Sequence, residues 1–496
     1  MPQRNDTAIW SGLFRISAES GQTLQAQIRQ AIVAAILDRQ IAASMPLPSC
    51  RILAEKLGVA RGTVVLAFQQ LVDQGFLVAR ERRGHFVNPE VLATPKPAQK
   101  ANDNSNDIDW KARRQIAASD MPPPAKHGNW IKSSYPFVYG QFDPALFPTA
   151  EWRECNRMAL AVLEIRNWAA DMVDRDDPLL IEQIQARLLP RRGIFANPDE
   201  IIVTLGAQNA LYMLANLLMT KGSKVAMEDP GYPDARSIFK LAGAETVPTP
   251  VDEQGIVTSA IPSDAGFVFV TPSHHCPTMV PLSNERRQDL LARAVRNNQI
   301  IIEDGYDSQL LDEAPQQALK SIDRSGRVIY VGSMSKTLAP GLRLGYIVGS
   351  AGLIAELRAL RRFMLRHPPA NNQRAVALFL SLGHHEALVR RLSSAFDERR
   401  KRLVQTISAF LPDWRSTDSA GGTSLWLEGP RNFDARDLAV QAAARGVIIE
   451  PGDRFFDRAD KPARFMRLGI SSIALQHIEP GIRELATAAG RRPAAA

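Results

Sequence analysis

A lysine, two serines and an arginine are clustered in one short segment of this 496-residue chain. Lys336 closely follows Ser333 and Ser335, and an arginine, Arg343, comes seven residues after the lysine. An ε-amine can condense with an aldehyde, whereas hydroxyl groups and a guanidinium bind phosphate. These residue types at this spacing suit a ligand that carries both an aldehyde and a phosphate.

An aspartate and two tyrosines that suit an aromatic ring occur upstream of this segment. Asp304 and Tyr306 follow an apolar run, and Tyr232 lies in the turn-forming sequence Glu-Asp-Pro-Gly-Tyr-Pro. A carboxylate beside a pyridine nitrogen keeps that nitrogen protonated, which makes the ring an electron sink. Tyr306 is expected at a ring hydroxyl, and Tyr232 on the ring face. Together with Lys336, these residues predict a site for pyridoxal phosphate.

The candidate residues come near the ends of short apolar runs that alternate with helical stretches. The runs are residues 201–204, 224–227, 267–270, 300–302 and 328–331. Such runs are typical of buried parallel strands, and their alternation with helices predicts an α/β doubly wound fold, which binds ligands where its strands end. Gly206, Ala207 and Gln208 open a predicted helix after the first run, and backbone amides at a helix start attract phosphate.

Residues 1–90 predict a different fold, a winged helix-turn-helix. The predicted elements are helices over residues 23–38, 50–57 and 61–74 and strands over residues 76–78 and 85–87. Apolar residues recur in the helices at three- and four-residue spacing, and Ser49 is a suitable N-cap for the second helix. The two strands surround a basic tip, as in a wing.

The third predicted helix is expected to enter the major groove of duplex DNA and to read bases with its first residues. Arginines there bind guanine edges or phosphates, and wing arginines contact an adjacent phosphate or the minor groove. The predicted DNA-binding residues are Arg51, Arg61, Gly62, Thr63, Arg82 and Arg83. For each arginine by itself, a solvated position on a small helical bundle stays open; the whole arrangement favours DNA.

Composition and charge limit the class of protein. The net charge of +8 and the pI near 9.5 permit a polyanionic partner. No apolar stretch reaches the roughly 18–20 residues of a membrane span, and the N-terminus lacks the apolar core of a secretion signal. We therefore expect a cytoplasmic protein without membrane contact. Cys50, Cys155 and Cys276 are too far apart for a C-x-x-C pair, so no metal site is expected.

A change in composition separates the two predicted folds. Residues 91–128 are polar and rich in proline, which is typical of a flexible linker. The second domain is expected over residues 129–490. Its part from about residue 381 reads as a smaller α+β lobe, with strands near residues 424–427 and 466–470.

Six motifs resemble those of MocR-type regulators of the GntR superfamily, which join a GntR-type winged helix to a fold-type I aminotransferase-like domain. The motifs are LPSCRILAEKLGVARGTV, VTLGAQNAL, EDPGYPDARSIF, VTPSHHCPT, IIEDGYDSQ and SMSKTLAPGLRLGY. The resemblance implies a PLP-dependent transferase fold with a mixed, mostly parallel sheet, an internal aldimine at Lys336, and a homodimer. It implies that Arg467 holds an α-carboxylate. The implied phosphate contacts are Ser333, Ser335, Arg343 and the amides of Gly206 and Ala207.

The chain departs from the aminotransferase pattern beside the cofactor. Aminotransferases usually have Asn-Pro-Thr-Gly where this chain has Cys-Pro-Thr-Met, from Cys276 to Met279. The usual asparagine contact to the ring hydroxyl is therefore missing, and His275 or Cys276 is expected to line that place. Met279 should narrow the pocket. Efficient transamination is in doubt, whereas binding of cofactor and ligand is expected.

Functions of different classes fit these residues. The first is a transcription regulator in which an amino-acid-like amine forms an external aldimine in place of Lys336 and alters binding to operator DNA. The second is an active PLP-dependent aminotransferase that carries a vestigial DNA-binding module. A sensor of pyridoxal phosphate itself is a third. Repeated turnover with an amino donor and a 2-oxo acid would distinguish the second function from the first.

Overall fold

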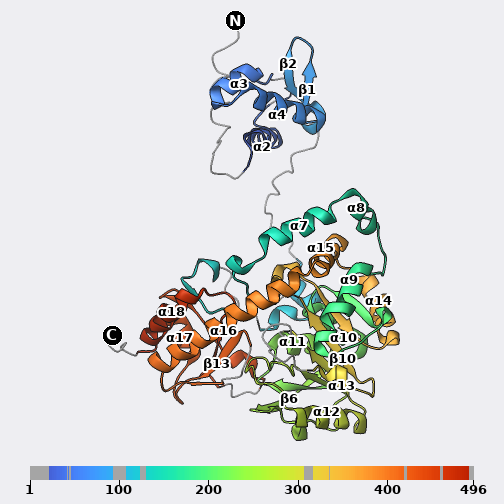
Figure 1. Ribbon diagram of the computed structural model, residues 1–496, viewed down its shortest axis with the longest axis vertical. Helices are drawn as coiled ribbons and strands as arrows, with labels where there is room; N and C mark the ends of the chain where they lie inside the picture. Colours follow the sequence, from blue (N-terminus) through green and yellow to red (C-terminus); the bar gives the residue numbers. More distant parts are fainter. Residues whose placement is uncertain are drawn as a thin grey trace. The chain divides into compact units, whose positions relative to one another are not determined.

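The computed structural model describes most of the chain. The described residues are 22–41, 43, 46–92, 108–114, 116–122, 130–306, 317–334, 336–417, 422–457 and 462–490. The chain divides into two compact units, Met1–Arg113 and Arg114–Ala496 (Figure 1). Within the described ranges, no helix combines the length and the apolar character that crossing a bilayer requires.

The N-terminal unit is a winged helix-turn-helix. Its elements are α2 (Leu24–Leu37), α3 (Cys50–Leu57), α4 (Arg61–Asp73), β1 (Leu77–Arg80), β2 (Gly84–Val87), α5 (Pro89–Leu92) and α6 (Trp110–Arg113). The Ser49 hydroxyl accepts a hydrogen bond from the Ile52 amide and caps α3, as predicted. Gly58 ends α3 with a φ of +64°, which glycine adopts without strain. These local signals explain the bounds of α3, and all three predicted helices agree with the structure to within one residue.

The wing is a regular antiparallel hairpin. Leu77 pairs with Val87, and Arg80 pairs with Gly84. Arg80 therefore belongs to β1 rather than to the predicted tip. Its guanidinium lies 4.6 Å from the ring centroid of Phe86, a cross-strand contact that supports the end of the pairing.

An eight-stranded sheet forms the centre of the second unit. Its strands are β4 (Ile201–Thr204), β5 (Lys224–Asp229), β6 (Glu245–Asp252), β7 (Gly255–Ile256), β8 (Phe267–Val270), β9 (Ile300–Asp304), β10 (Val328–Ser333) and β11 (Gly345–Val348). Their order is β4-β11-β10-β9-β8-β5-β6-β7. β11 and β7 run antiparallel to their neighbours, and the other pairs are parallel. The expected mixed, mostly parallel sheet is confirmed.

Helices cover both faces of this sheet. The helices of this large lobe are α7 (Thr149–Ala159), α8 (Val162–Trp168), α9 (Pro178–Gln183), α10 (Ala207–Leu218), α11 (Pro233–Leu241), α12 (Asn284–Arg296), α13 (Leu319–Ile322), α14 (Ala351–Met364) and α15 (Ala370–Ser381). Phe269 and Ile302 pack with α10, α11 and α14, whereas their chain neighbours Val268 and Ile301 pack with α12. Successive strand residues are thus buried on opposite faces, which explains the uninterrupted apolar runs.

The small lobe combines segments from distant parts of the chain. Its elements are β3 (Tyr135–Pro136), α16 (His384–Phe410), β12 (Arg415–Ser416), β13 (Ser424–Glu428), α17 (Ala435–Ala443), β14 (Val447–Ile448), β15 (Glu450–Pro451), β16 (Phe465–Gly469) and α18 (Leu475–Ala488). A four-stranded sheet has the order β12-β13-β16-β15, and β14 pairs in parallel with β3. The lobe therefore includes a strand that precedes the large lobe, which a boundary near residue 381 leaves out.

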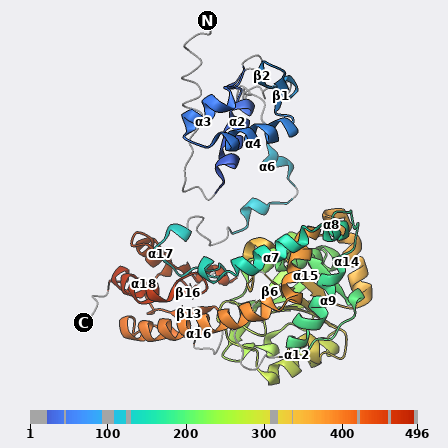
Figure 2. The same ribbon diagram turned by 45° about the horizontal axis from the view of Figure 1, so that its top comes forward.

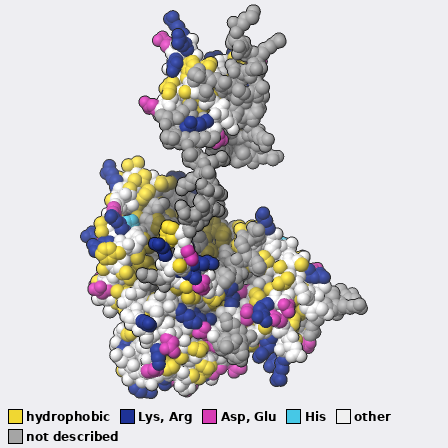
Figure 3. All heavy atoms as spheres, turned by 180° about the vertical axis from the view of Figure 1, so that it is seen from behind, with side chains coloured by type: hydrophobic (Ala, Val, Ile, Leu, Met, Phe, Trp, Pro, Cys, Tyr) yellow, Lys and Arg dark blue, Asp and Glu magenta, His cyan; other side chains and the backbone are white. Residues whose placement is uncertain are grey.

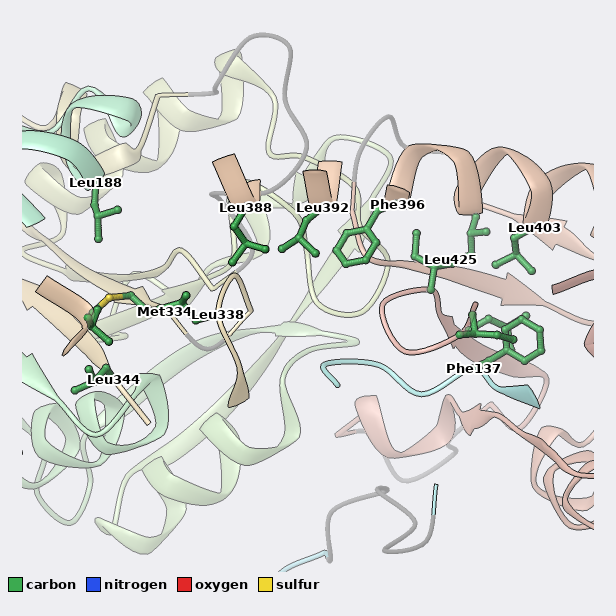
Figure 4. Close-up of a cluster of buried hydrophobic side chains, with 14 of the residues drawn as sticks. Phe137, Leu188, Met334, Leu338, Leu344, Leu388, Leu392, Phe396, Leu403 and Leu425 are labelled. Atoms are coloured by element: carbon green, nitrogen blue, oxygen red, sulfur yellow. The ribbon is translucent and has the colours of Figure 1, made fainter. Parts of the chain in front are cut away.

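The 27-residue helix α16 joins the two lobes. Figures 1 and 2 show it running from the large lobe to the helices and strands of the small lobe. Its buried stripe includes Leu388, Leu392, Phe396 and Leu403 (Figure 4). Met334, Leu338 and Leu344 belong to the same hydrophobic cluster and bracket Lys336. The loop that carries Lys336 is therefore anchored in the core on both sides.

Candidate functional site

The carboxyl ends of three strands meet at one edge of the large sheet. Asp304 is the last residue of β9 and pairs with Val331, two residues before the end of β10. Ser333 ends β10 and pairs with Gly345, which in turn pairs with Thr204 at the end of β4. Since α10 begins just after β4, its amino end lies at the same edge, where open α/β sheets bind ligands.

A cavity of about 180 Å³ lies at this edge. The predicted site residues that line it are Ala207, Gln208, Tyr232, Asp304, Tyr306, Ser333, Lys336, Arg343 and Arg467. Gly206 is adjacent, against the Arg343 side chain. Ser335 lies outside the described residues, and His275 does not line the cavity.

The start of α10 and Arg343 form one end of the cavity. Gly206 caps the helix with a φ of +83°, and a Cβ there would lie only 3.4 Å from the Arg343 guanidinium. Arg343 Nη2 donates to the Leu205 carbonyl at 3.0 Å, which orients the guanidinium. The amides of Ala207 and Gln208 lie in the first helical turn, where no partner within the helix is available. A guanidinium beside a helix start fits a phosphate.

Asp304 contributes a buried carboxylate with an unsatisfied oxygen. Its Oδ1 is buried and accepts no hydrogen bond from the described part of the chain. Burial raises the pKa of Asp304 to about 7, an effect that the charge of Lys336 partly opposes. A buried acceptor without a donor is costly in a folded protein. A protonated ring nitrogen would supply that donor, so Asp304 fits the pyridine ring of pyridoxal phosphate.

Lys336 contacts an aromatic ring that the sequence did not predict. Its Nζ lies 4.2 Å from the ring centroid of Tyr139. The guanidinium carbon of Arg467 lies 3.8 Å from the same centroid. Both cations are therefore within reach of the ring electrons. Because Tyr139 follows β3, a segment anchored in the small lobe supplies one wall of the cavity.

The two predicted ring contacts line the cavity with their hydroxyls already engaged. The Tyr306 hydroxyl donates to the His274 carbonyl at 2.9 Å. A hydroxyl has one proton, so Tyr306 would give up this bond in order to donate to a ligand. The Tyr232 hydroxyl lies 3.5 Å from Asp234 Oδ2, which also accepts from Gln208 Nε2 at 2.6 Å. Asp234 thereby links Tyr232 to the start of α10.

Arg467 is held by a carboxylate that also lines the cavity. Its Nε donates to Glu450 Oε2 at 2.7 Å, and its Nη2 lies 2.6 Å from the same oxygen. The two residues are opposite each other in β16 and β15. The remaining nitrogen, Nη1, lies 3.8 Å from Cys276 Sγ. Glu450 therefore occupies one of the two edges through which the guanidinium can form a bidentate pair, and it competes with a ligand carboxylate for Nη2.

Removing the charge of Glu450 is expected to strengthen the binding of acids. Glycine carries a carboxylate that methylamine lacks, so the ratio of the two affinities reports the contact to Arg467. In Glu450→Gln protein loaded with pyridoxal phosphate, this ratio should rise about tenfold, because a hydrogen bond between the ligand carboxylate and the freed guanidinium contributes roughly 1.5–3 kcal/mol. Titration of the cofactor's visible absorbance measures both affinities. Glu428→Gln is the control, since Glu428 pairs with Arg464 at 2.7 Å on the same sheet without lining the cavity. An equal rise in both variants would contradict the role of Glu450.

The structure does not bring His275 to the cavity. Its Nδ1 lies 2.6 Å from the Thr278 hydroxyl, and its Nε2 lies 3.7 Å from the Glu228 carboxylate. Burial lowers the pKa of His275 to about 3 and raises the pKa of Glu228 to about 8, so both groups are mostly uncharged at pH 7. Cys276, one residue further on, lines the cavity instead.

Met279 does not narrow the cavity as expected. It is buried away from the lining and has a φ of +64°, a conformation that glycine adopts more readily. Its sulfur lies 2.8 Å from the position that a Cβ on Gly422 would take. The methionine therefore fills space beside Gly422, where a larger residue would clash.

The predicted DNA-binding residues lie at two places on the N-terminal unit. Arg51, Arg61 and Gly62 are exposed at the starts of α3 and α4, whereas Thr63 is partly buried. Arg82 and Arg83 are exposed in the turn between β1 and β2. The helix starts and the turn thus present four guanidinium groups to solvent, as contacts to phosphates and base edges require.

Several cavity residues lack a local sequence signal. They are Tyr139, Gly140, Pro233, Asp234, Pro340, Glu450, Arg454 and Phe455. Five of these eight come from the small lobe or from the segment after β3, and only tertiary folding brings these segments to the cavity. For Glu450 the sequence offers a weak indication: the acid and a Pro-Gly turn follow the apolar residues 447–449, as at the end of a strand.

Two families match the chain. Residues 24–87 match Bacterial regulatory proteins, gntR family, and residues 152–471 match Aminotransferase class I and II. The HTH-type transcriptional regulator TauR of Rhodobacter capsulatus is 44% identical over 95% of this chain and 98% of TauR. The probable rhizopine catabolism regulatory protein MocR of Rhizobium meliloti is 30% identical over 93% of each chain.

A solved aminotransferase structure resembles the second unit. The α-aminoadipate aminotransferase LysN of Thermus thermophilus, solved with N-(5'-phosphopyridoxyl)-L-leucine, has a TM-score of 0.70 and 25% identity, and the match covers 77% of this chain and 98% of LysN. The aminotransferase fold family is PLP-dependent. With a gntR family match over the winged helix and whole-length similarity to TauR and MocR, the chain belongs to the MocR-type transcriptional regulators, in which a GntR-type DNA-binding domain is joined to an aminotransferase-like domain.

Proposed function

We propose that this regulator binds DNA under the control of an amine that it recognises at a pyridoxal phosphate held by Lys336. The observation that carries the proposal is one cavity with an amine, a buried carboxylate that has one unsatisfied oxygen, and a helix start that suits an anion. These groups match the aldehyde, ring nitrogen and phosphate of a single molecule. Arg467 lines the same cavity, which favours an effector that carries an acid group, such as an amino acid.

Pyridoxal phosphate would supply an aldehyde carbon that combines reversibly with amines. Lys336 would hold this carbon and release it to the effector, while Asp304 would keep a proton at the ring nitrogen. Tyr232 and Tyr306 would restrain the ring, and Arg467 would orient the effector's acid group. The phosphate would be held by Ser333, Ser335, Arg343 and the amides of Gly206, Ala207 and Gln208.

The effector would act by favouring one arrangement of the two lobes, and the segment over residues 91–128 would carry this preference to the DNA-binding unit. We expect the regulator to work in the cytoplasm as a homodimer. A two-fold protein fits paired half-sites in operator DNA, and the length of the connecting segment allows more than one spacing of these half-sites.

An effector amine is expected to change both the visible absorbance of the bound cofactor and the affinity for DNA. The DNA probes are duplexes that the full-length protein selects from a random-sequence pool, and the amines are the common L-amino acids, β-alanine and ethanolamine. The affinity for the selected duplex should change about 5- to 150-fold, the usual size of a coupling between two sites. Spectral changes without any change in DNA affinity would contradict regulation by amines.

Arg61→Ala is expected to separate the two activities. It should lower the affinity of the full-length protein for the selected duplex about tenfold, because a base or phosphate contact is lost, and leave the spectral response unchanged. Arg113→Ala, which removes an exposed arginine at the end of α6, is the control. Equal DNA affinity of both variants would show that DNA binding does not use the start of α4.

An active aminotransferase is the second candidate, favoured by the presence of Lys336, Asp304 and Arg467 in one cavity. Two features oppose it: Cys276 stands where the asparagine is usual, and Glu450 already holds Arg467. Incubation with amino donors and a 2-oxo acid tests this function. Repeated turnover would support it, whereas a single half-reaction without a cycle would exclude it.

A further inference from the structure

The outward face of α4 is largely apolar at its amino half. Leu66 is 56% exposed and Val65 is 38% exposed, although the opposite face of the helix is buried in the core of the N-terminal unit. Gly62 lies one turn before Leu66 on the same face. We call Gly62, Val65 and Leu66 the outward strip. Adjacent exposed branched side chains on one face of a helix are unfavourable in water unless a partner covers them.

Gly62 has no role within the N-terminal unit that requires a glycine. It is exposed, its φ is not positive, and a Cβ at this position would meet no described atom within 4 Å. Glycine stabilises a helix less than alanine does. A missing side chain at an exposed helix start permits close approach of another molecule, and internal packing gives no other reason for it here.

The charges around the outward strip favour a polyanion. Arg61 precedes the strip, and Arg51 lies in the first turn of the preceding helix. The acidic residue of α4, Asp73, is at the opposite end of the helix, so the amino half is the part that a polyanion would approach. Figure 3 shows one face of this unit, on which exposed hydrophobic side chains lie near Lys and Arg side chains and a few Asp or Glu side chains. The positive charge of these arginines suits the phosphates that flank a DNA groove.

We propose that the outward strip reads thymine in the major groove of operator DNA through contact with the thymine C5-methyl group. That methyl is the apolar feature that a base edge presents in the major groove. Leu66 and Val65 contact methyl groups of one half-site, and Gly62 lets the helix approach the base edges. Arg61 supplies a polar contact beside them. This proposal rests on the proposed DNA-binding function, and it further identifies thymine as a base that α4 recognises.

Replacing thymine by deoxyuridine tests the proposal, because the substitution removes the methyl group alone. The full-length protein first selects duplexes from a random-sequence pool. Each thymine of a selected half-site is then replaced singly, and affinity is measured at fixed salt concentration. We expect at least one position per half-site at which the affinity falls about fourfold, the size expected for one buried methyl group. Affinities unchanged at every position would overturn the proposal.

Variants assign the methyl contact to the outward strip. In Leu66→Ala or Val65→Ala protein, the ratio of thymine to deoxyuridine affinity at the sensitive position should fall to about one, as in a double-mutant cycle. Leu37→Ala is the matched control: Leu37 is also exposed, lies on α2 and should leave the ratio unchanged. Arg61→Ala should weaken both duplexes equally. A ratio that survives in both strip variants would assign methyl recognition elsewhere and overturn the proposal.

Two further results distinguish the remaining possibilities. Gly62→Ala should lower DNA affinity about tenfold through steric crowding while the winged unit stays folded by circular dichroism. If Leu66→Ala instead reduces self-association and leaves the thymine ratio unchanged, the strip binds a second copy of the chain and the proposal fails. If the random pool yields no enriched duplex, the proposed DNA-binding function fails first.

Discussion

Lys336→Ala protein supplied with pyridoxal phosphate is expected to remain without the visible absorbance of a lysine-bound cofactor. Lys336 is the lysine that the described part of the chain contributes to the cavity lining. Its loop is anchored by the buried Met334 and Leu338, and among the described residues no other lysine lines the cavity. Without the amine, the aldehyde loses its covalent partner, and only the weaker contacts to ring and phosphate remain. The response of DNA binding to amines should disappear as well.

Absorbance after gel filtration and borohydride reduction followed by peptide mass analysis measure this effect. In the unchanged protein, reduction should fix the cofactor on the peptide that contains Lys336. Lys221→Ala is the control, because Lys221 is exposed in the turn before β5 and is absent from the cavity lining. A reduced adduct on another lysine of the Lys336→Ala protein would refute the assignment.

Asp304→Asn is expected to weaken cofactor binding about 10- to 100-fold, because a charged hydrogen bond to the ring nitrogen is lost and such a bond contributes roughly 1.5–3 kcal/mol. The same change should stabilise the cofactor-free protein at pH 8. Burial, opposed by the charge of Lys336, raises the pKa of Asp304 from 3.8 to about 7 in the folded state. Asparagine has no charge to bury at this position.

This pKa difference sets the direction of the pH dependence. The folded state holds the proton on Asp304 more tightly than the unfolded state, so its contribution to stability is complete below about pH 4 and is lost as the pH rises through 7. Between pH 5 and pH 8 the unfolding free energy should fall in the cofactor-free protein, by roughly 2–4 kcal/mol more than in Asp304→Asn. Burial also raises the pKa of Glu228, so part of the decrease in unfolding free energy with pH remains in both proteins.

Urea unfolding of the cofactor-free proteins at several pH values measures this difference. Asp199→Asn, at an exposed position of the same unit, should unfold like the unchanged protein. If the pH dependence of Asp304→Asn equals that of the unchanged protein, Asp304 is ionised in the folded state at ordinary pH. Its carboxylate would then need a partner other than the ring nitrogen.

The sequence predicted best where a local signal determines the structure. Ser49 and Gly58 set the ends of α3, and both act through their own backbone neighbourhood. The position of the candidate ligand-binding residues at strand ends, such as Asp304 and Ser333, was also predictable, because parallel strands place their last residues at one edge of a sheet. Length and apolar runs were enough to predict the large lobe.

The sequence predicted least where distant segments meet. Glu450 reaches the cavity through its pairing with Arg467 across two short strands of the small lobe. The side-chain directions of His275 and Cys276 depend on the local turn, and the choice between them could not be made from residue type. Strand β11 was missed because its four residues follow Arg343 without a loop signal of their own.

The pairing of β3 with β14 has a mechanical consequence. The chain contacts the small lobe through the Ser133 hydroxyl, which donates to the Gly446 carbonyl at 2.6 Å, and through the pairing of Tyr135–Pro136. Four residues after Tyr135, the same segment presents Tyr139 to Lys336 and Arg467. Under the proposed function, an effector that displaces the Tyr139 ring would move a segment that leads directly back along the chain to residues 91–128. The effect of binding would then not need to cross the large sheet.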